Sequence, residues 1–392
     1  MSRLIYITLL FACSLLVRTQ ADAQQAVFHN SGAQIVITKG ADVNIQGSML
    51  SEPSNNIAPK IQLNGNLSIS GDIINHSDNL FRISEGYLIL TGAGTQVISS
   101  NSSNPFLVYN LELNGTGTTL LQTNVRIIND LNFQQGYIDV GDQDLVLYKN
   151  AVTSGTPGDQ SMVVTSGTGR MIKSMAQQED ITFPVGSTSK GAHYSPVDVA
   201  WESGTFYSSS IVMLSVKPEK LDANTSPQNY LEKYWDVQVS GVDNPKADLT
   251  FHYAPEEVFG DSTQIYAMRF FENNGQMWPR FDGELNPVTH SFTFTTSDFG
   301  KFTAGDLGTS DFSDVIVFPN PNNGAFSIKV IAPAEGMMDM QFTNMAGQLL
   351  YSGQIDQGIH EYDFTNSPKG VYFVKIFFKE NPKIVTRKIV IR

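Results

Sequence analysis

The sequence predicts an all-β protein in three parts: degenerate β-solenoid or β-helix-like repeats, then an antiparallel β-sandwich, then a small Ig-like C-terminal β-sandwich. Three observations predict this class. Only 16% of the 392 residues are charged, 41% are hydrophobic and 32 are glycine, a profile typical of an extracellular β protein. Short apolar units recur about every twenty-two residues before residue 175. Beyond them, period-two alternation between Asn, Gly and Pro turns continues to the end.

Residues 1–23 have the features of a secretory signal peptide. Arg3 supplies a positive charge, residues 4–17 are apolar, and Ala21-Asp22-Ala23 is a small-residue cleavage site. The apolar run is shorter than the ~20 residues that span a bilayer, and no second such run follows, so we expect no transmembrane span in the mature chain. Cys13 sits in a lipoprotein-like box, but the apolar core continues beyond it, which favours cleavage after Ala23.

The composition of the mature chain excludes several kinds of site. Cys13 is the only cysteine, so after cleavage neither disulfides nor thiolate metal sites are available. Residues 24–314 hold 15 Lys or Arg against 31 Asp or Glu, a net charge of −16. Such an acidic body repels phosphates, so nucleic acid is not an expected partner.

A short unit of two alternating apolar residues, ending at glycine, recurs through the repeat region, residues 24–175. Its copies are Asp42–Gly47, Asn66–Gly71, Tyr87–Gly92, Asn110–Gly115 and Asp130–Gly136, with the first apolar residue at 43, 67, 88, 111 and 131. One short strand cannot bury its apolar face, but stacked copies can. The period suits one coil of a parallel β-solenoid, with glycine allowing positive φ at the corners. A meandering antiparallel stack is the alternative.

Longer strands are expected in the middle domain, residues 176–308, where turn clusters such as Val242–Pro245 separate them. Their spacing is typical of an antiparallel β-sandwich. The candidates are Ser195–Trp201, Ser209–Val216, Tyr234–Val239, Asp248–Tyr253, Gln264–Phe271, Ser291–Thr296 and Lys301–Gly305. Residues 309–314 are then a polar linker.

The three tryptophans, Trp201, Trp235 and Trp278, all fall in this domain. We interpret them first as core residues of a sandwich without disulfides, because tryptophan is mostly buried. The alternative is that Trp201 and Trp278 are exposed on one surface and contact a glycan, as in a carbohydrate-binding module.

A search for catalytic motifs finds no His-Glu-x-x-His, no phosphate-binding Gly-x4-Gly-Lys-Ser/Thr and no Gly-x-Ser-x-Gly. The six histidines lack ligand spacing, so neither a metal nor a cofactor is expected. The best carboxylate group is Asp139, Asp142 and Asp144, near Arg126 and Asp130, and it does not fill the nucleophile, acid and base roles together. We therefore expect no enzyme, with a β-helix glycan-active enzyme as the less favoured alternative.

Residues 315–392 contain about seven short alternating runs, which predict the small terminal sandwich. Three blocks stand in order: Phe318–Phe326, with its Pro-Asn-Pro; Asn344–Leu350; and Lys369–Lys375, followed by Lys388-Ile389-Val390. They resemble the type A C-terminal sorting domain of the type IX secretion system, although Asn344 stands where that family usually has Asp. The resemblance covers a fifth of the chain. It implies a sorting signal carried by Pro319, Asn320, Pro321, Gly324, Gly347, Gly370, Tyr372 and Lys388.

A second resemblance concerns Phe183–Gly186 and Tyr194–Val197. Repeat regions of secreted proteins with the same sorting domain often run into such a segment, which implies no activity. The combined features predict an exported cell-surface or secreted structural or adhesive protein. The sorting-domain resemblance implies that residues 315–392 engage the outer-membrane translocon and sortase. A surface glycan or protein is the expected ligand, and a carbohydrate-binding module protein is the main alternative function.

Overall fold

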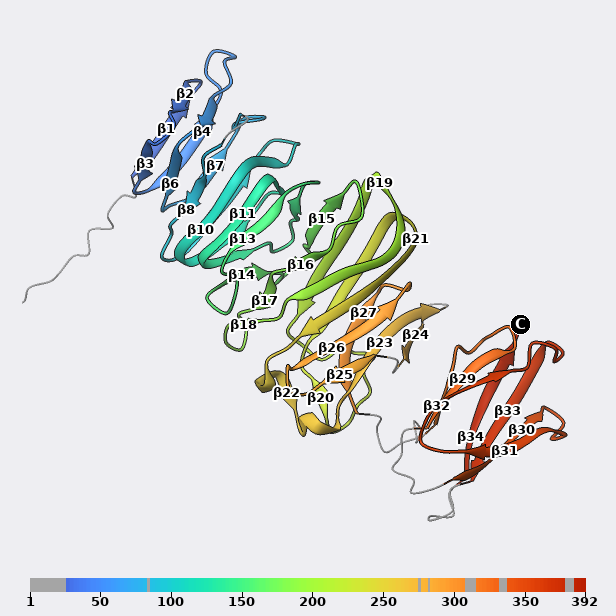
Figure 1. The fold of residues 1–392 in the computed structure, drawn as a ribbon. Coiled ribbons are helices and arrows are strands. Elements are labelled where there is room, and N and C mark those ends of the chain that lie inside the picture. Colours follow the sequence, from blue (N-terminus) through green and yellow to red (C-terminus); the bar gives the residue numbers. More distant parts are fainter. Residues whose placement is uncertain are drawn as a thin grey trace, which may run out of the picture.

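The computed structural model of the chain describes residues 26–82, 85–273, 276–280, 283–306, 315–330, 337–377 and 384–392. It is 62% strand and 2% helix, which confirms the all-β prediction (Figure 1). Its described helices are two short 3-10 turns, η1 (Pro255–Glu257) and η2 (Ser262–Gln264). The expected signal peptide and the linker 309–314 lie outside the described residues.

The repeat region folds into a β-solenoid of about seven turns, whose short strands stack in three parallel ladders. The first ladder contains β1 (Val27–Ser31), β4 (Ser48–Glu52), β7 (Ile73–Asn75), β9 (Thr95–Ser100), β14 (Ser161–Val164) and β17 (Val185–Ser187). The second contains β2 (Gln34–Ile37), β5 (Lys60–Leu63), β12 (Leu145–Leu147) and β15 (Met171–Met175). The third contains β3 (Asp42–Ile45), β6 (Asn66–Ile69), β8 (Leu88–Leu90) and β13 (Val152–Gly155). The long strands β10 (Phe106–Leu121) and β11 (Val125–Asp139) bend through all three.

The pairing register of the third ladder joins the repeat positions identified in the sequence. Val43 pairs with Leu67, Leu67 with Leu88, Leu88 with Leu111 and Leu111 with Leu131, all in parallel. The last four are 3% exposed or less, so like residues form a continuous apolar column. The solenoid prediction is therefore confirmed, and the antiparallel alternative is wrong for this region.

The glycines that end the repeat units are needed mainly for a different reason from the positive φ that was expected. Of the five glycines that end the units, only Gly47 and Gly136 have positive φ. A Cβ on Gly115 would lie 2.3 Å from the carbonyl oxygen of Gly92, and one on Gly136 would lie 2.0 Å from that of Gly115. Close approach between the backbones of successive coils therefore excludes a side chain there.

The last solenoid coil continues directly into antiparallel sheet. β15 is parallel to β12 but antiparallel to β19 (Val197–Lys217), which also pairs with β16 (Ile181–Phe183). β19 then pairs along most of its length with β21 (Tyr234–His252). Four of the strands expected in the middle domain thus form parts of two long ones. The register of this pair shifts between Trp201 and Ile211, and these β-bulges lie opposite residues 242–245 of β21, which resembled a turn in the sequence. A bulge accommodates extra residues in one strand without ending it.

The remaining strands of the body complete this sheet around an aromatic core. They are β18 (His193–Tyr194), β20 (Tyr230–Leu231), β22 (Val258–Phe259), β23 (Tyr266–Asn273), β24 (Gln276–Arg280), β25 (Glu284–Asn286), β26 (Ser291–Thr296) and β27 (Lys301–Gly305). Trp235, Phe251, Phe292, Phe294 and Phe302 pack together with centroid separations down to 4.7 Å. One hydrophobic core extends from Ile37 to Ala304, so solenoid and antiparallel strands form a single packed body.

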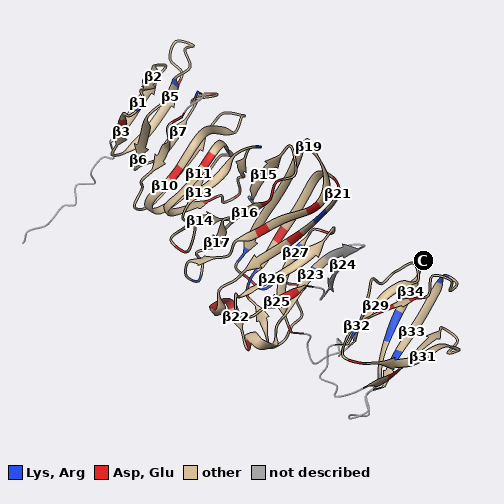
Figure 2. Ribbon diagram, viewed as in Figure 1, with Lys and Arg blue, Asp and Glu red and all other residues tan. Residues whose placement is uncertain are grey.

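The terminal domain is a sandwich of two antiparallel sheets with a core of its own. One sheet holds β28 (Val315–Phe318), β29 (Ala325–Val330) and β32 (Gly358–Asp363). The other holds β31 (Leu349–Ile355), β30 (Met338–Asn344), β33 (Gly370–Phe377) and β34 (Ile384–Ile391). These seven strands agree with the prediction. Figure 2 shows acidic segments along β19 and β21, as the negative charge of the body implied, and basic ones on β33 and β34.

Candidate functional site

The Pro319-Asn320-Pro321 segment lies against the edge of β34, so the first and last sorting blocks meet in space. The Asn320 side chain imitates a neighbouring strand: its Nδ2 donates to the carbonyl oxygen of Lys388 at 2.6 Å, and its Oδ1 accepts from the N–H of Val390 at 2.8 Å. The backbone of Asn322 continues the pairing with Val390 and Arg392 at 2.9 and 2.8 Å. This short segment therefore covers the free edge of the last strand.

Asn322 and Gly324 hold the segment in this conformation. Asn322 is 8% exposed; its Nδ2 donates to the Pro319 carbonyl oxygen at 3.0 Å and its Oδ1 accepts from the Gly324 N–H at 2.8 Å. Gly324 has φ +104°, and a Cβ there would lie 2.5 Å from the Cα of Thr365. Only glycine satisfies both conditions, which explains its place in the block.

The middle block is the tight turn between β30 and β31. Asn344 Oδ1 accepts from the N–H groups of Ala346 and Gln348, each at 3.0 Å, and Gly347 has φ +82°. An amide oxygen makes these bonds as an aspartate would, so the departure of Asn344 from the family pattern leaves the turn intact.

The last block contributes core packing and an exposed strand. The Tyr372 ring stacks on Phe342 with centroids 5.2 Å apart, and its hydroxyl donates to the Pro368 carbonyl oxygen. Lys388 is exposed on β34, where its carbonyl holds Asn320. Gly370 begins β33, and the nearest atom to a Cβ there is 3.8 Å away, so crowding does not require glycine at this position.

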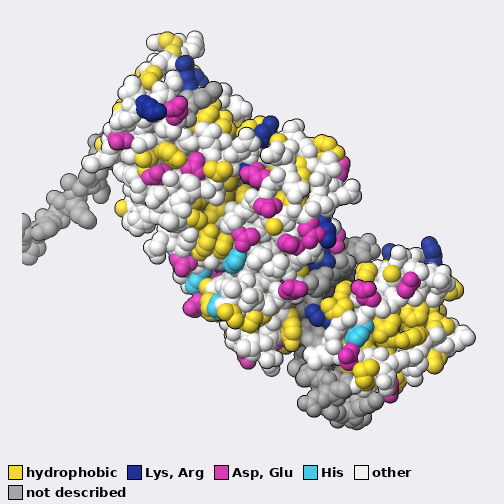
Figure 3. Space-filling model, in the orientation of Figure 1, with side chains coloured by type: hydrophobic (Ala, Val, Ile, Leu, Met, Phe, Trp, Pro, Cys, Tyr) yellow, Lys and Arg dark blue, Asp and Glu magenta, His cyan; other side chains and the backbone are white. Residues whose placement is uncertain are grey.

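An exposed apolar edge was not identified from the sequence. It consists of Met345, Leu349, Leu350, Tyr351 and Ile359, which are between 39% and 75% exposed. They lie at or beside β31 and β32, each an edge strand with one partner in the described sheets. Figure 3 shows hydrophobic side chains gathered on this domain. The sequence does carry a signal for this edge. Residues 349–351 are three consecutive apolar residues, whereas apolar and polar residues alternate in a half-buried strand.

The three carboxylates predicted as the best acidic cluster, Asp139, Asp142 and Asp144, accept hydrogen bonds within the solenoid. Asp139 Oδ1 accepts from Ser166 Oγ at 2.8 Å, Asp142 Oδ1 from the Thr168 N–H at 2.9 Å, and Asp144 Oδ1 from the Arg170 N–H at 3.1 Å. The Thr168 N–H and hydroxyl hold the pKa of Asp142 below its usual value. Each carboxylate thus ties one turn to the next coil.

Trp201 is not exposed, as a glycan contact would require. It is 6% exposed and packs against Phe206 and Phe299, with ring centroids 5.0 and 6.0 Å away. Trp235 is fully buried, as expected for a core residue. Trp278 lies on β24, but its side chain is outside the described residues, so its proposed glycan contact stays a prediction.

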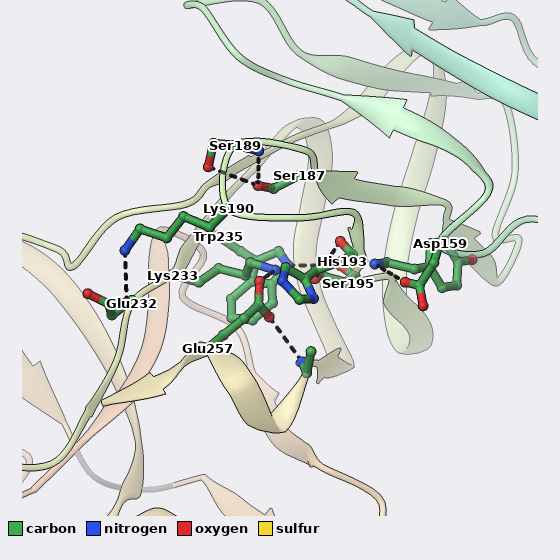
Figure 4. Close-up of polar contacts among 12 residues, drawn as sticks. Asp159, Ser187, Ser189, Lys190, His193, Ser195, Glu232, Lys233, Trp235 and Glu257 are labelled. Atoms are coloured by element: carbon green, nitrogen blue, oxygen red, sulfur yellow. Dashed lines mark hydrogen bonds and ion pairs between the residues drawn. The ribbon is translucent and has the colours of Figure 1, made fainter. Parts of the chain in front are cut away.

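A buried polar cluster joins the Tyr194–Val197 segment to the antiparallel strands (Figure 4). Lys233 is fully buried; its ammonium donates to Ser195 Oγ and pairs with Glu257, which is 8% exposed. The Trp235 indole N–H donates to the Ser195 carbonyl oxygen at 3.1 Å. Glu257 also accepts from the Ala254 N–H at 3.0 Å. Burial lowers the pKa of Lys233, and the Glu257 carboxylate opposes that effect.

A serine beside a lysine is one known arrangement for a nucleophile and its base. Here Ser195 and Lys233 both have no exposed surface, so a substrate carbonyl has no approach to the hydroxyl in this structure. The cluster instead fixes three chain segments to each other. Within the Tyr194–Val197 segment, Ser195 is the residue that accepts from the buried lysine.

Among the described residues, no group of three or more His, Cys, Asp or Glu side chains is placed to hold a metal ion. No helix in the described part of the chain is long and apolar enough to cross a membrane.

Comparison with known proteins concerns mainly the terminal domain. No curated protein sequence matches this chain. One solved structure is similar at 11% identity, covering 51% of this chain and 37% of that chain, with a TM-score of 0.17: PorZ, described as an essential bacterial surface component of the type-IX secretion system of Porphyromonas gingivalis. At that TM-score the likeness carries no inference about fold or activity. Residues 316–392 match the family described as secretion system C-terminal sorting domain, so this chain carries a C-terminal sorting domain of the type IX secretion system, the mark of a protein exported to the cell surface or the medium.

Proposed function

We propose that this chain is an exported surface or secreted protein with a structural and adhesive role and no catalytic one. The observation that carries the proposal is an extended parallel solenoid with one continuous core, linked to a sorting domain. Stacked coils offer long exposed ladders for contact with other molecules. The hydrogen bonds of Asp139, Asp142 and Asp144 support a structural use of the carboxylates that catalysis would need.

The route of export forms part of the proposal. Residues 1–23 act as a signal peptide at the inner membrane, and the terminal domain then engages the outer-membrane translocon and a sortase. The exposed apolar edge defined above supports a docking role for this domain, because strands with one unpaired side and exposed apolar side chains are suited to partner contact. Asn320 and Asn322 support it indirectly by holding the sorting blocks together.

Export is tested by expressing the chain in a bacterium with a type IX system and measuring its fraction at the surface and in the medium. Deletion of residues 315–392 should abolish export, and Leu349→Ser with Leu350→Ser should reduce it. Val288→Ser, on an 84% exposed body residue, is the matched control and should leave export unchanged. Normal export of the truncated chain would overturn the delivery proposal.

The adhesive role is tested with the purified mature chain. We expect it to bind at least one class of surface in a panel of cells, matrix proteins and glycans, through its body. A fragment of residues 24–314 is a suitable second reagent, because this body has a core separate from that of the terminal domain. Absence of binding across the whole panel would refute the adhesive role while leaving the export route intact.

A further inference from the structure

The second solenoid ladder differs in charge from the rest of the acidic body. Five of its strand segments, residues 34–37, 60–63, 106–109, 125–128 and 145–148, contain no Asp or Glu. They carry Lys60 and Arg126, and the intervening coil adds Arg82, which the parallel pairing of Ile61 with Phe81 places next to Gln62, two residues along the strand from Lys60. In a body of net charge −16, this ladder is a local basic surface.

A groove of about 480 Å³ opens on this ladder. Its lining includes Lys60, Gln62, Phe81, Arg82, Leu107 and Tyr109. The Lys60 ammonium donates to the carbonyl oxygens of Asp78 and Asn79 at 2.8 and 2.7 Å, and the Arg82 guanidinium donates to Gln34 Oε1 at 2.9 Å. These bonds hold both cations in place at the groove, so little side-chain entropy remains to be lost on binding.

The basic and aromatic surface continues onto the next coils. Arg126 lies next to Leu107 in the parallel register, and its guanidinium sits over the Tyr148 ring at 5.4 Å from the centroid. The Arg126 Nε–H is buried and has no acceptor among the described residues. Lys149 approaches the same ring at 5.2 Å. Tyr109 and Tyr148 are two coils apart, about 10 Å at the usual spacing of strands.

We propose that this groove and its continuation over Arg126 and Tyr148 bind an acidic polysaccharide bearing carboxylate or sulfate groups. The inference deepens the proposed adhesive function and rests on it. Lys60, Arg82 and Arg126 receive the anionic groups, since ammonium and guanidinium donors make strong bonds to carboxylate and sulfate oxygens. Tyr109 and Tyr148 pack on the apolar faces of sugar rings, and the Gln62 amide bonds hydroxyl groups.

The surroundings of the groove favour a polysaccharide over nucleic acid. Carboxylates flank it: Asp78 lies close enough to Lys60 to feel its charge, and Glu85 pairs with Lys39 at 3.7 Å. A densely charged phosphate backbone would meet these groups and the acidic body. A saccharide with one anionic group on each ring or every second ring can place its charges at the separated cations.

The test measures binding of the mature full-length chain to polygalacturonate oligosaccharides and to chondroitin sulfate, which carry about one anionic group on each ring, by calorimetry, with neutral dextran and single-stranded DNA as comparison ligands. We expect binding to one or both acidic polymers, weaker at high salt, and none to neutral dextran. Lys60→Gln with Arg126→Gln should weaken binding about tenfold or more. Lys246→Gln, which removes one charge from an exposed β21 residue, should leave it unchanged. Urea unfolding of each variant shows that the fold is kept.

Three results would overturn the proposal: no binding to either acidic polymer, equal binding by the Lys60/Arg126 variant, or tighter binding to single-stranded DNA. If the chain is exported and adheres to other surfaces but does not bind acidic polysaccharides, only the proposal for the groove is refuted. A chain that adheres to nothing refutes the adhesive function as well. The two failures are therefore distinguishable.

Discussion

Removing one partner of the buried pair of Lys233 and Glu257 should lower the free energy of unfolding more than removing any exposed charge of the body. Glu257→Gln keeps the shape and the bond from Ala254 but leaves the fully buried Lys233 ammonium without its counter-charge. Removing one partner of a buried ion pair costs ~3–5 kcal/mol. For a body of this size, that lowers the midpoint of thermal unfolding by roughly 6–10 °C.

The assay is urea unfolding followed by tryptophan fluorescence, which reports on Trp235 beside the cluster. Lys233→Met should also destabilise, because it leaves the Glu257 carboxylate buried. The double variant should be more stable than either single one, since neither charge then remains unpaired. Glu202→Gln, which breaks the exposed pair with Lys246, is the control and should change stability by less than ~1 kcal/mol.

The pH dependence supplies an independent check on the same reasoning. Burial lowers the pKa of Lys233, Lys173 and Lys217 below the ordinary value of 10.5. Between their lowered pKa values and 10.5 the unfolded chain binds more protons than the folded one, so the contribution of these lysines to stability rises with pH in that window. Glu257→Gln removes the charge that opposes the lowering of the Lys233 pKa, so this rise should begin at a lower pH. The account would be refuted if the losses in free energy of unfolding of the two single variants added up in the double variant, or if each single loss were as small as that of the Glu202→Gln control.

Three further predictions concern the solenoid and the tyrosines. Leu111→Ala, in the apolar column of the third ladder, should lower the free energy of unfolding by ~2–5 kcal/mol, whereas Glu112→Ala on the outward face should change it by less than ~0.5 kcal/mol; urea titration compares them. Gly115→Ala should destabilise by ~1–3 kcal/mol because its Cβ would meet the Gly92 carbonyl oxygen at 2.3 Å, while Gly94→Ala, with no atom within 4 Å, should be nearly neutral. Burial raises the pKa of Tyr87, Tyr194 and Tyr362 to about 12, so between pH 10 and 12 the folded chain retains protons that the unfolded chain loses, and stability should fall in this window. Ultraviolet absorbance of phenolate measures it, and Tyr87→Phe should reduce the fall.

The register of the solenoid could be predicted from sequence because it depends on one-dimensional spacing. Leu67, Leu88, Leu111 and Leu131 recur at one coil length, and stacking like on like is the arrangement that buries them all. The terminal strands were predictable for a similar reason. Turns at Asn344 and Gly347 carry local signals that need no tertiary information.

Features that depend on tertiary contacts were not predictable in this way. The residues at 242–245 read as a turn, yet they lie within β21, where bulges opposite β19 absorb them. Lys233 resembles a surface lysine in sequence. Its burial becomes intelligible only once Ser195 and Glu257, from distant segments, are placed around it. The corner glycines were identified correctly but explained incompletely, because contact between coils is invisible in a single repeat.

The arrangement of cores bears on the fate of the terminal domain. The body has one core from Ile37 to Ala304, and the terminal domain has another from Val315 to Ile391. Between them, Ile316 packs against the small cluster of Leu221, Met268 and Phe270. Among the residues that the structure describes, this apolar contact lies outside both large cores, so removing the terminal domain would open neither of them. The last coil of the body, moreover, is covered by β19 rather than by the terminal domain. Removal of residues 315–392 should therefore leave the solenoid and its antiparallel extension folded.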